Sequence, residues 1–160
     1  MKWDYIFLEL DNTLISPRNP KNENVEGVSD IYLTDRSYEV LKYHKDNGSK
    51  IYVLTNQPLI AMGKRTLDDV YALLYATNYL LGNLLDGFGI CPHHPSGVVT
   101  KYAKVCACKK PADGLLREFI ADRGITREDL KGSLFVGHSS SDATLARQYG
   151  MEFKAPSDFF

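Results

Sequence analysis

Apolar segments of strand length alternate with helix-like segments along most of this chain. Strand patterns lie at 4–10, 50–54, 133–137 and 151–155, and a shorter candidate lies at 87–90. Helical patterns lie between or beside them, at 34–47, 66–82, 111–124 and 140–150. Alternating strands and helices predict an α/β fold, with a central parallel sheet covered by helices on both faces.

Several helix boundaries and one long loop carry signals of their own. We expect Thr34 to cap the first helix and the turn at Asn47–Ser49 to end it. Thr66 and Asp69 have capping-box spacing at the start of the 66–82 helix. Segment 16–30 is polar and is broken by two prolines and a glycine. A loop of that length in a compact domain is usually functional or disordered.

The composition excludes several classes of protein. A chain of 160 residues can bury a real core, and we expect one domain over 1–160. The net charge of −1 offers no basic excess for nucleic acid. No apolar run approaches the ~20 residues of a membrane span, and the N-terminal segment lacks the layout of a signal peptide. We therefore expect a cytoplasmic protein that binds neither nucleic acid nor membrane.

Polar side chains follow three of the predicted strands. The first strand ends in FLELDNTLI, which places Glu9 and Asp11 one residue apart, and side chains at that spacing on a strand share a face. TNQ follows the second strand at 55–57, and GHSSSD follows the fourth at 137–142. Ligands of parallel α/β sheets bind at the carboxyl ends of the strands, so these segments predict one site. The two acids suit magnesium binding and attack on phosphorus.

The three cysteines lie in one short segment, CPHHPSGVVTKYAKVCAC. An odd number of cysteines without an export signal disfavours a disulfide framework. Three thiolates and one imidazole form a closed tetrahedral zinc site, which predicts a structural zinc on loop 91–108 with these ligands: Cys91, His93, Cys106 and Cys108. His94 is a rival ligand, and buried cysteines beside a solvated histidine are the alternative.

Taken in order, FLELDNT, VLTNQ, CACKKP and FVGHSSSD resemble the four motifs of the haloacid dehalogenase (HAD) phosphohydrolases. Within that superfamily the chain resembles the D-glycero-D-manno-heptose-1,7-bisphosphate 7-phosphatases, with the histidinol-phosphate phosphatases next. The resemblance covers roughly Ile6 to Gly150 and implies a HAD-like Rossmannoid α/β/α fold of three layers with a minimal cap. The heptose phosphatases carry a zinc-stapled loop with C-x-H and C-x-C, which favours His93 over His94.

The resemblance also implies roles for individual residues. Glu9 occupies the position of the aspartate that attacks phosphorus, and Asp11 that of the acid that protonates the leaving group and activates water. Thr55 and Asn56 would hold the transferring phosphoryl group, and Gln57 completes the motif.

The third and fourth motifs complete the expected site. Lys110 would neutralise the charge of phosphate and nucleophile, and Lys109 stands where an arginine is usual. Magnesium would be held, more weakly than in the family, by these residues: Glu9, Asp11, His138 and Asp142. Each position also has a plainer interpretation, because strand-end turns, surface lysines and a helix-capping Asp142 would leave the same pattern.

Three departures from the family pattern bear on activity. Glu9 replaces the attacking aspartate and is longer by one methylene, and a misplacement of about 1 Å can cost ~100-fold in rate. His138 replaces an acid in the metal motif, whereas magnesium prefers oxygen ligands. Asn12 replaces a usual glycine. The pattern predicts a pseudophosphatase that binds a small phosphorylated molecule without efficient hydrolysis.

Two other functions stay open. One is a working magnesium-dependent phosphomonoesterase on a sugar phosphate or related metabolite. The other is a zinc-stabilised interaction protein, with a homodimer formed through Tyr71, Tyr75 and Tyr79, which share a helix face at i, i+4 spacing. Packing of these tyrosines under a loop is the alternative. For a ligand, Arg18 and Lys21 in the long loop are candidates to read a second anionic group.

Overall fold

A five-stranded sheet forms the centre of the computed structural model, which describes residues 2–160. The strand order is β5-β4-β1-β6-β7, and every neighbouring pair is parallel. The strands are β1 (Tyr5–Leu8), β4 (Lys50–Asn56), β5 (Gly87–Cys91), β6 (Leu134–Val136) and β7 (Glu152–Lys154). The predicted α/β class with a central parallel sheet is confirmed.

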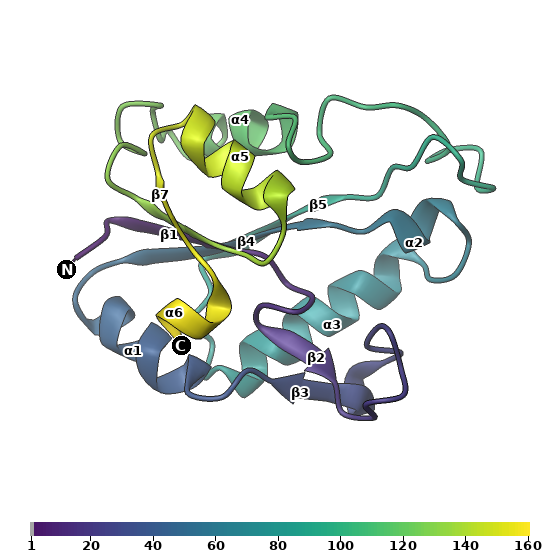
Figure 1. Cartoon of the computed structure of the whole chain (residues 1–160), viewed down its shortest axis with the longest axis horizontal. Coiled ribbons are helices and arrows are strands. Elements are labelled where there is room, and N and C mark those ends of the chain that lie inside the picture. Colours follow the sequence, from purple (N-terminus) through teal and green to yellow (C-terminus); the bar gives the residue numbers. More distant parts are fainter. Residues whose placement is uncertain (1) are drawn as a thin grey trace.

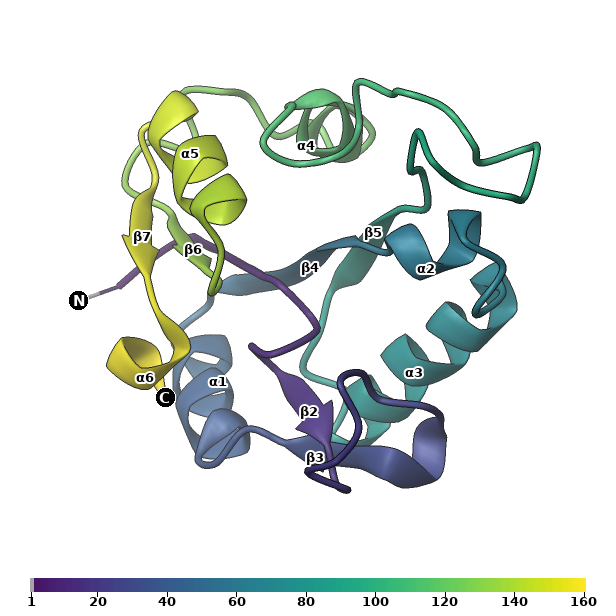
Figure 2. The ribbon, with the colours of Figure 1, turned by 45° about the vertical axis from the view of Figure 1, so that its right-hand side comes forward.

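Helices cover both faces of the sheet and make three layers (Figure 1). On one side lie α1 (Ser37–Asp46) and α3 (Leu67–Leu80), and on the other lie α4 (Gly114–Ala121) and α5 (Ser140–Gln148), as Figure 2 also shows. Two short helices were not predicted, α2 (Pro58–Ala61) and α6 (Pro156–Phe159). No helix within residues 2–160 is long and apolar enough to span a bilayer.

Side chains of the central strand β1 point alternately to the two faces of the sheet, which divides the hydrophobic core into two clusters. Ile6 and Leu8 of β1 are fully buried on the side of α1 and α3, whereas Phe7 is fully buried on the side of α4 and α5. The same alternation holds in β4, where Ile51 and Val53 face the first cluster and Leu54 the second. A strand buried on both faces reads as a continuous apolar run, which is the pattern that predicted it.

The order of the strands reverses direction at β1. From β1 the chain moves to β4 and β5 on one side, and it then returns to β6 and β7 on the other. In open α/β sheets, ligands bind outside the carboxyl ends of the strands at the point where this direction switches. At this point Glu9 follows β1, Gly137 follows β6, and Thr55 is the next-to-last residue of β4.

The first helix begins later than expected. Thr34 does not cap it, because its hydroxyl donates instead to the carbonyl of Thr13 at 2.6 Å, and α1 starts at Ser37 after Arg36 in a left-handed conformation (φ 62°). By contrast, α3 begins with the predicted capping box between Thr66 and Asp69. The expected end of α1 is confirmed, since Asp46 is its last residue.

Segment 16–30 is an ordered part of the fold. It contributes to a two-stranded antiparallel hairpin of β2 (Ile15–Pro17) and β3 (Ile31–Leu33), with a 3₁₀ turn, η1 (Val28–Asp30), before β3. The Asp30 carboxylate accepts hydrogen bonds from the backbone amides of Asn19 and Glu26, both at 3.1 Å. The hairpin packs against α3 and is the only sheet among residues 2–160 besides the central one, which fits the expected minimal cap.

A buried histidine joins the C-terminal helix to α1. His44 is 7% exposed and packs between Trp3 and Phe159, with ring centroids 5.1 and 5.5 Å away. Burial lowers the pKa of His44 below its ordinary value, and the positive charge of Lys154 acts in the same direction. The folded protein therefore binds a proton at His44 only at lower pH than the unfolded chain does.

We expect this histidine to destabilise the fold in mild acid. The unfolded chain takes up its proton near pH 6.5, so the free energy of unfolding falls as pH decreases through about 6.5, by up to about 1.4 kcal/mol per unit of pKa depression. His44→Phe keeps the ring packing and should remove this component in urea unfolding between about pH 8 and 5. His138→Phe, at an exposed histidine, is the control and should leave this pH-dependent component of the free energy of unfolding unchanged. Equal pH profiles of His44→Phe and the wild type would contradict the assignment.

Candidate functional site

Three buried charged side chains meet at the switch point of the sheet. Lys110 is 2% exposed, and its Nζ contacts Glu9 Oε2, Asp142 Oδ1 at 2.6 Å and the carbonyl of Leu54 at 2.7 Å. Glu9 and Asp142 are 6% and 1% exposed. Lys110 is therefore not a solvated surface lysine, because all three of its protons have acceptors inside the protein.

The two acids respond differently to this environment. Burial raises the pKa of Glu9 above its ordinary value, although the charge of Lys110 acts in the opposite direction. Burial also acts to raise the pKa of Asp142, but the ion pair with Lys110 and the hydrogen bonds from Ser139 together hold that pKa below its ordinary value. Asp142 is thus the firm anionic partner of Lys110.

Asp142 has two structural partners as well as Lys110. Its Oδ2 accepts from the amide and hydroxyl of Ser139 in the capping box of α5, at 3.1 and 2.7 Å. The capping interpretation of Asp142 is therefore confirmed, and the same carboxylate also pairs with Lys110, whereas its role as a magnesium ligand stays a prediction. A Cβ at Gly137 would lie 2.5 Å from Asp142 Oδ2, so only glycine lets the end of β6 approach this carboxylate.

A chain of hydrogen bonds joins Glu9 to Asp11. The Thr55 hydroxyl donates to Glu9 Oε1. Gln57 Nε2 donates to Asp11 Oδ2 at 2.6 Å and to Thr55 Oγ1 at 3.0 Å. Strand β1 ends at Leu8, so these bonds, rather than strand alternation, bring the two acids together.

The backbone after β1 turns sharply at Asn12. This residue is left-handed (φ 55°), a conformation that asparagine tolerates better than most residues other than glycine. Asparagine at this position is therefore compatible with the turn. Asp11 Oδ1 is buried beside the turn and has no hydrogen-bond partner among residues 2–160.

Asn56 holds the main chain of Lys110. Its Nδ2 donates to the Lys110 carbonyl at 3.1 Å, and its Oδ1 accepts from the Lys110 amide at 3.0 Å. Both polar atoms of the amide are thus engaged with the backbone that carries the lysine. In this structure Asn56 positions Lys110, and its direct contact with phosphate stays a prediction.

Three expected residues lie outside the hydrogen-bonded cluster. His138 is exposed and has no side-chain hydrogen bond to the described residues. Arg18 is also exposed, and it donates across the hairpin to the carbonyl of Ile31 at 3.0 Å. Lys109 is half-buried and lines a cavity of about 400 Å³ together with Lys104, Lys110 and Ser141.

The structure adds one residue that the motifs did not indicate. Arg65 Nη1 donates to Gln57 Oε1 at 3.0 Å, and its Nη2 donates to the carbonyl of Val25 at 2.7 Å. Arg65 also lines a larger cavity of about 650 Å³, between the hairpin and the start of α3, which Lys21 lines as well. That cavity includes none of the motif residues, so the smaller cavity beside Lys110 is the better candidate for a ligand.

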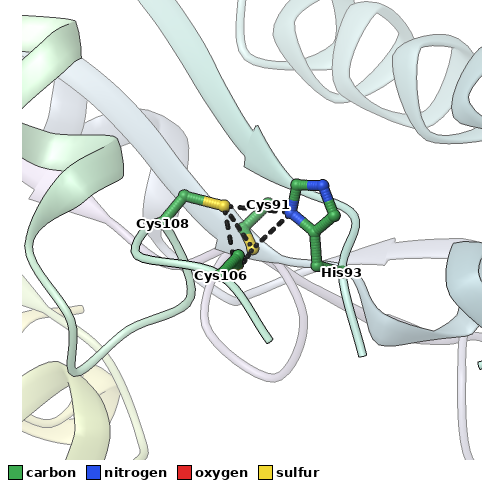
Figure 3. A group of neighbouring side chains, drawn as sticks. All are labelled: Cys91, His93, Cys106 and Cys108. Atoms are coloured by element: carbon green, nitrogen blue, oxygen red, sulfur yellow. Dashed lines mark hydrogen bonds between the residues drawn. The ribbon is translucent and has the colours of Figure 1, made fainter. Parts of the chain in front are cut away.

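The four proposed zinc ligands converge at the end of β5 (Figure 3). Their ligand atoms all lie within 4.8 Å of one another. The sulfur atoms are 3.0–3.6 Å apart, and His93 Nδ1 lies 3.1 and 3.8 Å from two of them. A tetrahedron with zinc–sulfur bonds of about 2.3 Å has edges of about 3.8 Å, so these residues fit zinc after a small expansion.

The rival ligand faces elsewhere, since His94 Nδ1 accepts from the amide of Ser96 at 3.1 Å. Cys108 and Lys110 are two residues apart. A metal on the cysteines would thus fix the chain immediately before the buried lysine. A closed set of three thiolates and an imidazole leaves no open position for substrate, which makes the role structural.

Comparison with known proteins identifies the superfamily. Residues 5–160 match the family model described as polynucleotide kinase 3 phosphatase. The chain is 31% identical over 144 residues to D-glycero-beta-D-manno-heptose-1,7-bisphosphate 7-phosphatase of Escherichia coli K12, with 88% of this chain and 72% of that protein covered. This chain belongs to the HAD superfamily. The corresponding Yersinia pestis enzyme is 30% identical over 150 residues, which cover 91% of this chain and 76% of that protein.

Solved structures of HAD proteins share the fold. D,D-heptose 1.7-bisphosphate phosphatase from B. bronchiseptica, in complex with magnesium and phosphate, superposes with a TM-score of 0.76 at 23% identity, covering 96% of this chain and 79% of that one. A HAD-like phosphatase from Mesorhizobium loti gives a TM-score of 0.79 at 24% identity, covering 94% and 70%. These similarities confirm the HAD-like fold.

We predict about one tightly bound zinc per chain. Elemental analysis of protein prepared without chelator should find it, and His93→Ala should lose it while His94→Ala retains it. Cys106→Ser should also lose the metal and should make loop 91–108 sensitive to protease, with the circular dichroism of the sheet and helices preserved. Zinc-free wild type, or equal zinc content in the two histidine variants, would contradict the assignment.

Proposed function

We propose that this HAD protein binds a small phosphorylated molecule at the carboxyl edge of β1 and β4 and hydrolyses it slowly or not at all. The proposal rests mainly on the burial and the hydrogen bonds of Glu9. At the position where the family resemblance places the attacking aspartate, Glu9 is buried and accepts hydrogen bonds from Thr55, Lys110 and the amide of Leu10.

This setting disfavours attack by Glu9. In-line attack requires the reacting atoms to lie ~3–3.5 Å apart in a fixed direction, and an error of about 1 Å can cost ~100-fold. Glu9 has an extra methylene relative to aspartate, and its carboxylate is bound on both oxygens. Burial also raises the pKa of Glu9, although the charge of Lys110 opposes that shift.

The residues expected to hold magnesium fit that ion poorly. Asp142 uses one oxygen for Lys110 and the other for Ser139, and His138 offers an exposed imidazole in place of an oxygen ligand. Asp11 Oδ1 is the one acidic oxygen in this cluster that is buried and free among residues 2–160. We therefore propose weak magnesium binding, and we assign no step of the binding function to the metal.

Several features support phosphate binding. Lys110 supplies a buried cation, and Thr55 supplies a hydroxyl, which donates to Glu9 in this structure. The cavity of about 400 Å³ beside Lys110 has the size of a small metabolite and is lined by Lys104 and Lys109. Because the curated relatives named above are heptose-bisphosphate phosphatases, we propose a sugar phosphate as the ligand class.

Asp11 also favours one alternative function. An acid with a free, buried oxygen beside the proposed phosphoryl site could activate water directly, which would give a phosphomonoesterase that does not need Glu9 as nucleophile. Turnover separates this enzyme from the binding protein.

A homodimer is a further proposal for this chain. The side chains of Tyr71, Tyr75 and Tyr79 are 40%, 62% and 76% exposed, so they do not pack under a loop as the alternative interpretation held. Tyr71 and Tyr75 stack on each other at 6.3 Å. An exposed aromatic row on one helix suits a self-complementary contact.

We expect phosphate, vanadate or a sugar phosphate to raise the melting temperature of the wild type through mass action on the folded state. Thr55→Val, which removes one hydroxyl, should reduce the rise, and Lys110→Met should abolish it. Lys131→Met, at an exposed lysine, should leave the rise unchanged. The screen should include a 3′-phosphorylated oligonucleotide, because the matching family model carries a polynucleotide phosphatase name.

Hydrolysis of p-nitrophenyl phosphate by the wild type should lie barely above the blank and should not change in Glu9→Gln. Robust turnover that Glu9→Gln abolishes would refute the binding function and identify Glu9 as a nucleophile. Robust turnover that survives Glu9→Gln and is lost in Asp11→Asn would identify the water-activating enzyme instead. No stabilisation by any phosphorylated compound would leave the pocket without a ligand and refute the proposal.

A further inference from the structure

Arg65 lies where the hairpin, β4 and α3 meet. It directly precedes Thr66, whose capping box with Asp69 fixes the first turn of α3, so the backbone of Arg65 is held by the start of a helix. Its guanidinium bonds both Gln57 Oε1 and the carbonyl of Val25 in the hairpin loop. Val25 itself is 1% exposed, so this anchor of the loop lies in the core.

Because arginine can only donate hydrogen bonds, Arg65 determines which atoms donate and which accept in the chain of hydrogen bonds from Gln57 to Glu9. A guanidinium only donates, so Gln57 must present its oxygen to Arg65 and its two Nε2 hydrogens to the other side. Those hydrogens go to Asp11 Oδ2 and Thr55 Oγ1. Because Thr55 Oγ1 accepts from Gln57, its own hydrogen is directed to Glu9 Oε1.

This polarity leaves one oxygen of Asp11 free. Gln57 engages Oδ2, while Oδ1 is buried and has no partner among residues 2–160. If Gln57 could turn its amide over, its oxygen would face Asp11 and Thr55, and neither side chain would keep a fixed orientation. Arg65 prevents that reversal from a position outside the acid cluster.

We propose that Arg65 is a positioning residue of the phosphate site, acting through Gln57 to fix the orientation of Asp11 and Thr55. The inference rests on the proposed phosphate binding, because it assigns Arg65 a role at that same site. It also makes the hairpin loop part of the site, since one guanidinium holds both Val25 and Gln57. The competing explanation is that Arg65 merely anchors the loop or adds positive charge.

The first experiment compares two neighbouring cations. Arg65→Met keeps most of the aliphatic stem and should weaken binding of inorganic phosphate about tenfold, as expected for one charge-assisted hydrogen bond. Lys64→Met is the matched control, because Lys64 lines the same cavity and has no side-chain hydrogen bond to residues 2–160. Its affinity should match the wild type. Arg65→Lys should recover part of the loss, since lysine can still donate to Gln57.

A double-mutant cycle separates positioning from a general effect. In a Gln57→Leu background, Arg65→Met should have no further effect on phosphate affinity, because the intermediary is gone. Additive losses, equal losses in Arg65→Met and Lys64→Met, or unchanged affinity in Arg65→Met would each overturn the inference while leaving phosphate binding established.

A second readout does not depend on phosphate. The side-chain amide protons of Gln57, assigned by their absence in Gln57→Leu, should be two sharp, slowly exchanging NMR signals in the wild type. They should broaden or exchange quickly in Arg65→Met and remain sharp in Lys64→Met. Unchanged signals in Arg65→Met would overturn the inference. A wild type that binds no phosphate would refute the proposed function, and these signals would still decide whether Arg65 holds Gln57.

Discussion

The buried ammonium group of Lys110 is the interaction on which the rest of the site depends. It joins Glu9 after β1, Asp142 in α5 and the carbonyl of Leu54 in β4, so three neighbouring elements meet on one charge. Removing one partner from a buried ion pair typically costs about 3–5 kcal/mol, because the other charge is left without compensation. The packing of this edge and its proposed affinity for an anion would therefore have the same origin.

Two neighbouring groups fix the main chain of Lys110. Asn56 binds its amide and carbonyl, and the proposed zinc cluster ends two residues earlier at Cys108. Loop 91–108 has no helix or strand beyond its first residue, so neither element type can fix its end. A metal bound by the four residues would give that rigidity without a larger core, which would connect the proposed zinc to the geometry of the proposed phosphate site.

Much of this architecture could be predicted from the sequence, because the three strands beside the site, β1, β4 and β6, contain continuous apolar runs and three of the four motifs follow them. Three features were not predicted correctly from the sequence, each for a local physical reason. Thr34 looks like a helix cap, but its hydroxyl reaches Thr13, which is distant in sequence. The hairpin at 15–33 was hidden by its polar residues, because only a few apolar side chains such as Val25 anchor it in the core and Asp30 orders the loop through hydrogen bonds. Arg65 belongs to no motif and acquires its contacts only in the folded chain.

We propose that Glu9 and His138 silence a site that otherwise retains its HAD architecture. Glu9→Asp combined with His138→Asp restores the reach of the nucleophile and an oxygen ligand, so the double variant should show magnesium-dependent hydrolysis of p-nitrophenyl phosphate or a heptose phosphate. Each single variant should stay near the wild type, because groups that act as a unit are strongly non-additive. A folded, phosphate-binding double variant that remains as inactive as the wild type would contradict the account.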